Sequence, residues 1–159
     1  MTNSTLSRKN VIFGTGPLGL SVMDALVERG YSDITLVNRR GHAPEALPAG
    51  VNIVAGDATN PDGVAVLTAG TNVVFHCAQP EYHEWPEKFP PITSGILEGV
   101  SRSGAKLIFG DNLYMYGSTG GAPIREDLPY ASTGRKGSTR AKMAQQLLDA
   151  HKAGKVKVA

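Results

Sequence analysis

Three glycines near the N-terminus are spaced so that they could hold a phosphate group against the start of a helix. Residues 10–19 read NVIFGTGPLG, a short apolar run followed by G-x-G-x-x-G. In this pattern the first glycine makes a tight turn, the second admits a pyrophosphate close to the backbone, and the third lets the helix pack near the strand. The proline suits the first helical position, where free N–H groups point at phosphates. Six residues form this predicted turn: Gly14, Thr15, Gly16, Pro17, Leu18 and Gly19.

A second apolar run ends about twenty residues further on, where dinucleotide-binding folds place the residue that reads the adenosine ribose. The residues there are Asn38, Arg39 and Arg40, so the carboxylate typical of an NAD site is absent. Without it nothing repels a 2′-phosphate, and a charge-assisted bond from a guanidinium would add about 1.5–3 kcal/mol, or roughly 10- to 150-fold in affinity. The two motifs predict a nicotinamide dinucleotide site that favours NADP over NAD. Arg40 could equally be a solvated loop charge.

Short apolar segments alternate with amphipathic ones along the whole chain. The pattern predicts strands near 10–14, 33–38, 51–55, 72–76 and 105–110, with a further strand beginning near 156. It predicts helices near 17–29, 61–69, 89–103 and 135–153. Such alternation is typical of parallel sheets with right-handed crossovers. We therefore expect an α/β fold, a Rossmann-type doubly wound parallel β-sheet with helices on both faces, in a single domain over residues 1–159.

Composition narrows the classes of partner. A net charge of +2 gives no indication of nucleic acid or an anionic membrane. The single cysteine, Cys77, excludes an intramolecular disulfide and fits a reducing compartment. Residues 1–10 are polar and lack the apolar segment of a signal peptide, and no apolar run approaches the ~20 residues of a membrane span. We expect a cytoplasmic soluble protein.

Further motifs follow the predicted strands in a recognisable order. They are AGDAT at 55–59, HCAQP at 76–80, FGDNLYMYG at 109–117, PIREDLPY at 123–130 and RKGSTRAKMAQQLL at 135–148. In this order the chain resembles the extended and atypical short-chain dehydrogenase/reductase superfamily, in its NAD-dependent epimerase/dehydratase branch. The resemblance implies that Asp57 and Ala58 lie against the adenine. It also implies that Cys77, Ala78 and Gln79 lie along the cofactor.

The chain departs from that family at the catalytic positions. Where the family has Ser-Ser after the fifth strand, this chain has Asp111 and Asn112. Where the family has Tyr-x-x-x-Lys, the nearest match is Lys136-Gly-Ser-Thr-Arg140. The phenols of Tyr114, Tyr116 and Tyr130 lie outside the family's register, and packing is the simpler role for each. No catalytic residue is therefore assigned from the sequence.

The resemblance leaves three interpretations of the whole protein open. Family members continue much further, whereas this chain ends in KVKVA, so the substrate-binding part is expected to be missing. If the complete protein is an enzyme, it is an oxidoreductase, epimerase or dehydratase that acts through hydride transfer at C4 of the nicotinamide on an unknown small molecule. The alternatives are a non-catalytic dinucleotide-binding or redox-sensing module, or an inactive fragment.

Three other sets of residues admit a structural role as well as a functional one. His76, Cys77, Glu81, His83 and Glu84 are close in sequence, but their spacing fits no standard zinc pattern, so no metal is predicted. Trp85 either faces the substrate or anchors its loop on the next helix. A third group, the apolar stripe of the helix at 135–153, belongs to the core or to a homodimer interface. Its members are Met143, Ala144, Leu147, Leu148 and Ala150.

Overall fold

The computed structural model describes residues 8–43 and 46–159, so most of the polar N-terminal segment lies outside it. The strands are β1 Asn10–Phe13, β2 Ile34–Asn38, β3 Val51–Ala55, β4 Val73–His76, β5 Lys106–Phe109 and β6 Lys157–Val158. The helices are α1 Pro17–Glu28, α2 Pro61–Leu67, α3 Trp85–Ser101 and α4 Arg135–Lys152. Two short 3₁₀ turns complete the order, η1 Tyr82–Glu84 and η2 Tyr114–Tyr116.

The six strands form one parallel sheet in the order β3-β2-β1-β4-β5-β6. The first strand lies near the centre, and Phe13 at its end pairs with Val37 on one side and His76 on the other. Because the strand order reverses between β1 and β4, the loops that leave these two strands diverge and open a crevice at the carboxyl edge. The predicted Rossmann-type doubly wound fold is confirmed.

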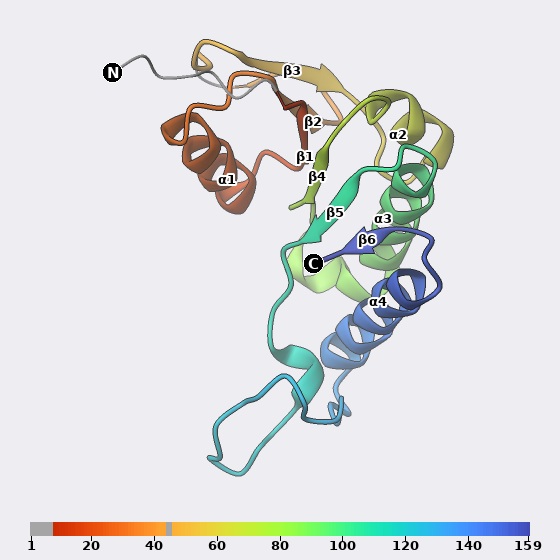
Figure 1. The fold of residues 1–159 in the computed structure, drawn as a ribbon. Coiled ribbons are helices and arrows are strands. Elements are labelled where there is room, and N and C mark those ends of the chain that lie inside the picture. Colours follow the sequence, from red (N-terminus) through yellow and green to blue (C-terminus); the bar gives the residue numbers. More distant parts are fainter. Residues whose placement is uncertain (1–7, 44–45) are drawn as a thin grey trace.

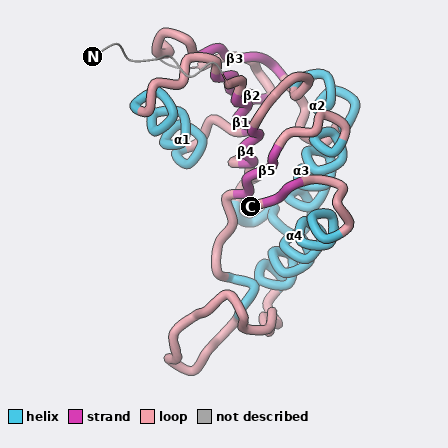
Figure 2. Tube along the Cα trace, in the orientation of Figure 1, coloured by secondary structure: helices cyan, strands magenta, loops and turns pink. Residues whose placement is uncertain are grey.

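Helices cover both faces of the sheet, as Figures 1 and 2 show, with α1 on one side and α2, α3 and α4 on the other. Each strand sends alternate side chains to opposite faces, so the core has two parts. Under α1 the buried residues are Ile12, Met23, Ile34, Leu36 and Val51. The larger part, under the other helices, includes Val11, Phe13, Val37, Val64, Val74, Ile96, Val100, Leu107 and Leu147.

Helix α3 begins at Trp85, four residues before the predicted start at 89. The prediction was wrong because Pro90 and Pro91 look like the beginning of a helix, whereas both lie inside this one. Trp85 and Phe89 are one turn apart, both are buried, and their rings meet edge to face at 5.5 Å. Packing of this pair outweighs the two backbone hydrogen bonds that the prolines cannot make. Of the two roles considered for Trp85, the structure shows the one in which it anchors its loop on the helix.

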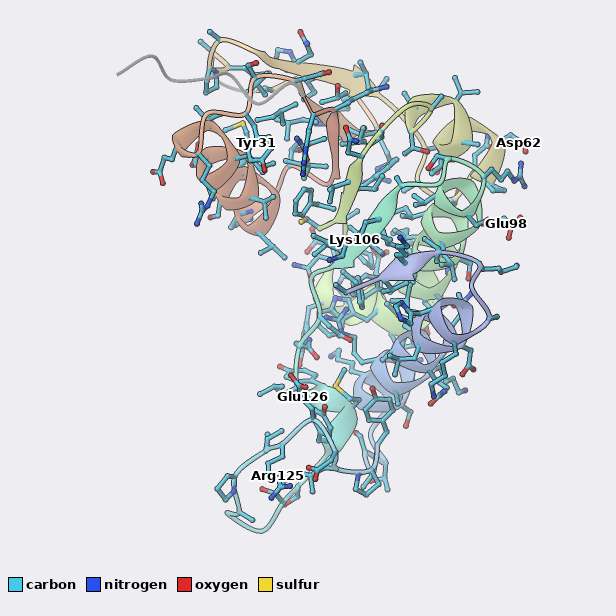
Figure 3. All side chains as sticks on the ribbon, in the orientation of Figure 1. Tyr31, Asp62, Glu98, Lys106, Arg125 and Glu126 are labelled. Carbon is cyan, nitrogen blue, oxygen red and sulfur yellow. The ribbon has the colours of Figure 1, made fainter. Side chains whose placement is uncertain are left out.

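The stripe along α4 belongs to the core of this chain. Met143, Ala144, Leu147 and Ala150 are buried, and only Leu148 is exposed, at 42%. Between β5 and α4, the predicted irregular segment extends beyond the carboxyl edge of the sheet and carries the exposed residues Arg125 and Glu126 (Figures 1 and 3). Within residues 8–43 and 46–159, no helix is both long and apolar enough to cross a lipid bilayer.

Candidate dinucleotide-binding cleft

A cleft of about 580 Å³ opens at the carboxyl edge where β1 and β4 diverge. Its walls come from the β1–α1 turn, the ends of β2, β3 and β4, and the first half of α3. Twelve of the fourteen residues predicted from the sequence line it: Gly14, Thr15, Gly16, Pro17, Leu18, Asn38, Arg39, Asp57, Ala58, Cys77, Ala78 and Gln79. The other two, Gly19 and Arg40, lie outside the lining.

The three glycines of the turn have different surroundings. Gly14 has φ +104°, and a Cβ there would lie 2.6 Å from the backbone nitrogen of Ala78. At Gly19 a Cβ would lie 2.0 Å from the carbonyl oxygen of Gly14. At Gly16 a Cβ would meet no atom within 4 Å. The fold itself therefore requires the outer two glycines, whereas the middle one leaves open space that a pyrophosphate would fill.

Helix α1 starts at this open space with its backbone donors unused by side chains. Gly16 is the N-cap, Pro17 holds the first helical position, and the first turn contains no acidic residue. No side chain of the described residues caps this end. Because the N–H groups of a first turn have no partner within the helix and carry its positive dipole end, this terminus attracts an anion.

The end of β2 separates the three polar residues that the sequence grouped together. The Asn38 amide donates to the Thr15 hydroxyl and to the His42 carbonyl, both at 3.0 Å. Its oxygen accepts from the backbone N–H groups of Arg40 and Gly41. Asn38 is thereby satisfied inside the protein and ties its turn to the glycine-rich turn. Of these three residues, Arg39 is the one whose charged side chain belongs to the cleft wall.

Asp57 follows β3 as an ionised group on the cleft wall. One of its carboxylate oxygens accepts from the backbone N–H and the hydroxyl of Thr59, at 2.9 and 2.7 Å. These two hydrogen bonds hold the pKa of Asp57 below its ordinary value, with a smaller contribution from the charge of Arg39. The carboxylate is thus ionised at neutral pH, and its second oxygen can accept from a ligand.

The turn after β4 brings a thiol against the glycine-rich turn. The backbone N–H of Cys77 donates to the Phe13 carbonyl at 2.8 Å, which extends the pairing of β1 and β4. Burial raises the pKa of the Cys77 thiol to about 11, so it stays protonated at neutral pH. A protonated thiol is a poor nucleophile, and we assign Cys77 a packing role beside the cleft.

An ion pair at the start of α3 adds charge to the cleft that the sequence did not reveal. Glu84, the last residue of η1, and Lys88 of α3 both line the cleft and pair with each other. The hydrogen bond from Lys88 holds the pKa of Glu84 below its ordinary value, and the charge of Arg39 contributes less. No motif marks these two residues, because only the early start of α3 brings them to the cleft.

The end of β5 carries a buried ion pair at the positions where the family has its catalytic residues. Arg140 is only 2% exposed, and its Nε lies 3.0 Å from Oδ1 of Asp111. Its guanidinium is enclosed by the rings of Trp85, Phe89 and Phe109, at 4.7–5.2 Å. Nη1 of this guanidinium has no hydrogen-bond partner. The group in the family's lysine position is thus turned into the protein.

His76 is a core residue. It is fully buried, its Nε2 lies 3.0 Å from the Thr93 hydroxyl, and its ring packs on Phe109. Burial and, to a lesser degree, the charge of Arg140 lower the pKa of His76 to about 3, so the ring is neutral. Across residues 8–43 and 46–159, no three side chains of His, Cys, Asp or Glu come together as a metal site.

Comparison with known proteins gives the family. A family model described as NAD(P)H-binding matches residues 14–114. The chain belongs to this NAD(P)H-binding family. Over 163 aligned residues it is 25% identical to a UDP-glucose 4-epimerase of Azospirillum brasilense, covering 94% of this chain and 47% of that protein. A shorter match, 40% identical over 63 residues, joins it to a 2-alkyl-3-oxoalkanoate reductase of Stenotrophomonas maltophilia (strain K279a), covering 40% of this chain and 18% of the reductase.

Solved structures share the fold. One is a UDP-galactose 4-epimerase, with a TM-score of 0.78 at 22% identity over 94% of this chain and 54% of the other. Another is a UDP-glucose 4-epimerase from Brucella ovis in complex with NAD, with a TM-score of 0.78 at 19% identity over 94% and 50%. This NAD(P)H-binding chain spans about half the length of these relatives. The resemblance to epimerase/dehydratase-type short-chain dehydrogenases is confirmed.

Proposed function

We propose that the cleft binds NADP(H) in preference to NAD(H), with the pyrophosphate on the first turn of α1. The observation that carries this proposal is the open space beside Gly16 at the uncapped start of that helix. A ligand with two negative phosphates would satisfy the free N–H groups there and fill the room left by the missing Cβ.

The remaining cofactor contacts are distributed along the carboxyl edge. We expect Arg39 to pair with the 2′-phosphate, Asp57 and Ala58 to lie against the adenine, and Ala78 and Gln79 to lie along the nicotinamide half. Asn38 acts indirectly: it binds Thr15 of the glycine-rich turn and accepts from the backbone N–H groups of Arg40 and Gly41, which fixes the turn that carries Arg39. Arg40, outside the cleft lining, is expected to contribute little.

We further propose that the complete protein is an oxidoreductase or epimerase acting on a small organic molecule. When bound, the dinucleotide supplies a hydride acceptor or donor at its nicotinamide C4. The residues of this chain bind and orient it at the switch point of the sheet. Support comes from the likeness to a UDP-glucose 4-epimerase, whose length this chain half covers.

A non-catalytic dinucleotide-binding module is the second candidate. It is favoured by the inward position of Arg140, which is paired with Asp111 and enclosed by aromatic rings instead of facing a ligand. Sensing in such a module would depend on the redox state of the dinucleotide, because the Cys77 thiol stays protonated.

Calorimetric titration with NADPH and, separately, NADH tests the cofactor proposal. We expect NADPH to bind more tightly by about tenfold or more, the value of one charge-assisted bond to the 2′-phosphate. Arg39→Ala should remove this difference, whereas Arg40→Ala, the matched control, should keep it. Equal binding of the two dinucleotides would refute the NADP preference, and binding of neither would refute the site.

A further inference from the structure

Three side chains from separate elements form an exposed polar cluster beside the cleft. Tyr82 begins η1 directly after the cleft-lining turn that follows β4, Tyr114 begins η2 after β5, and Lys136 lies in the first turn of α4. The two phenol oxygens lie 3.4 Å apart, and the Lys136 ammonium sits 3.6 Å from the centre of the Tyr82 ring. We call these three residues the phenol cluster.

The phenol cluster has unused hydrogen-bonding capacity. A separation of 3.4 Å is long for two hydroxyls, whose usual distance is about 2.7–2.8 Å, so neither phenol fully satisfies the other. Both side chains are accessible, Tyr82 at 52% and Tyr114 at 46%. The interaction with the Tyr82 phenol raises the pKa of Tyr114, so its hydroxyl is protonated at neutral pH. An incoming oxygen atom would meet two exposed phenol hydroxyls, with a positive charge over the face of the Tyr82 ring.

The surroundings of the phenol cluster combine a fixed wall with an apolar hollow. The Trp85 ring lies 5.1 Å from the ring of Tyr82 and 5.9 Å from the ring of Tyr114. The Arg140 guanidinium lies 5.1 Å from the centre of the Trp85 ring. Tyr114 also borders a shallow hollow of about 450 Å³ that Leu113 and Ile124 line with exposed apolar side chains. This arrangement suits a molecule with one polar oxygen and an apolar body.

We propose that the phenol cluster binds the oxygen atom of a carbonyl-bearing, otherwise apolar small molecule. The inference rests on the proposed function, because a carbonyl oxygen gains negative charge when its carbon accepts a hydride. Donors and a positive charge aimed at that oxygen stabilise the change. In the family one helix provides the phenol and the amine. Here the phenols of Tyr82 and Tyr114 come from two loops, and Lys136 of α4 provides the ammonium.

Trp85 makes the proposal testable without the cofactor, since it is the only tryptophan and touches the phenol cluster. The probe is 4-nitroacetophenone, with 4-nitroethylbenzene as its matched partner lacking the carbonyl, and the readout is quenching of Trp85 fluorescence. We expect the ketone to bind about three- to tenfold more tightly, the contribution of one or two neutral hydrogen bonds. The double variant Tyr82→Phe/Tyr114→Phe should abolish that preference, and Lys136→Met should reduce it.

Tyr116→Phe is the control, because this phenol packs on Tyr130 at 5.5 Å, apart from the three residues of the phenol cluster. The control should keep the preference for the ketone. Equal affinity for the two probes, no quenching by either up to its solubility limit, or a preference that survives in the double variant would overturn the proposal. NADPH titration of the same variants separates the two proposals, since no residue of the phenol cluster lines the cofactor cleft. Loss of NADPH binding in the wild-type chain would count against the proposed function instead.

Discussion

Helices α1 and α2 both begin with proline but differ in the residue that precedes it. Both have proline at the start, Pro17 and Pro61. At α2 the side chain of Asn60 accepts from two backbone N–H groups of the first turn, at 3.1 and 3.2 Å. At α1 the corresponding residue is Gly16, which has no side chain to offer, and no other described side chain takes its place.

This difference supports the proposal that the N-terminus of α1, and not that of α2, binds an anionic ligand. The α2 terminus also carries Asp62, an exposed acid that complements the helix dipole and points to solvent at the periphery in Figure 3. Capped and charge-compensated, that terminus has nothing left to attract an anion. The α1 terminus has neither feature and faces the cleft. The residue before the proline therefore determines whether the first N–H groups are capped by a side chain, as with Asn, or stay free for an anion, as with Gly.

The largest effect is expected from Gly16→Ala. Its Cβ would enter space that is empty in the protein alone, at an ordinary φ of −79°, so stability should change by less than about 1 kcal/mol, because the lower entropy of the unfolded chain is offset by the preference of an N-cap for Gly over Ala. The same Cβ would block the pyrophosphate, and NADPH affinity should fall by about a hundredfold, or ~2.7 kcal/mol. Urea unfolding and calorimetry measure the two quantities. Gly14→Ala, with φ +104° and a backbone clash, should instead disrupt folding. Unchanged NADPH affinity in Gly16→Ala would show that the pyrophosphate does not lie at the start of α1.

A smaller effect is expected from Asn38→Asp, which would bring a negative charge beside the open helix end. The carboxylate could still accept from the turn but could no longer donate to the His42 carbonyl. We expect the ratio of NADPH to NADH affinity to fall by roughly fivefold to tenfold, because the new charge repels the 2′-phosphate. Parallel titrations of both dinucleotides measure the ratio. An unchanged ratio would show that Asn38 does not influence the ribose end.

The smallest effect is expected at the capped terminus. Asn60→Ala should lower the free energy of unfolding by about 1 kcal/mol, the usual value of an N-cap side chain. NADPH affinity should stay within about twofold of wild type, since Asn60 is outside the cleft lining. Denaturant unfolding with a matched NADPH titration checks both. A large loss of NADPH affinity would mean that the two helix ends are not separate in function.

The fold and the glycine-rich turn could be predicted because local sequence determines them. Gly14 has φ +104°, and Gly19 packs against a carbonyl oxygen, so both positions require glycine. Their spacing is therefore visible in the sequence. The rest depends on contacts between distant segments. Nothing near Trp85 shows that it packs with Arg140 of α4, and this packing fixes both the start of α3 and the inward turn of the guanidinium. The residue type at Asn38 fitted a ribose contact, whereas its partners are internal.

We propose that the first turn of α1 is a phosphate site and that the first turn of α2 is not. The most direct test follows backbone amide signals of ¹⁵N-labelled protein by NMR as NADPH is added. We expect the amide signals of Leu18 and Gly19 to shift strongly and in a saturable way, while the amide signals of Asp62 and Gly63 stay in place. Saturation by NADPH without a shift at Leu18 and Gly19, or with equal shifts at Asp62 and Gly63, would contradict it.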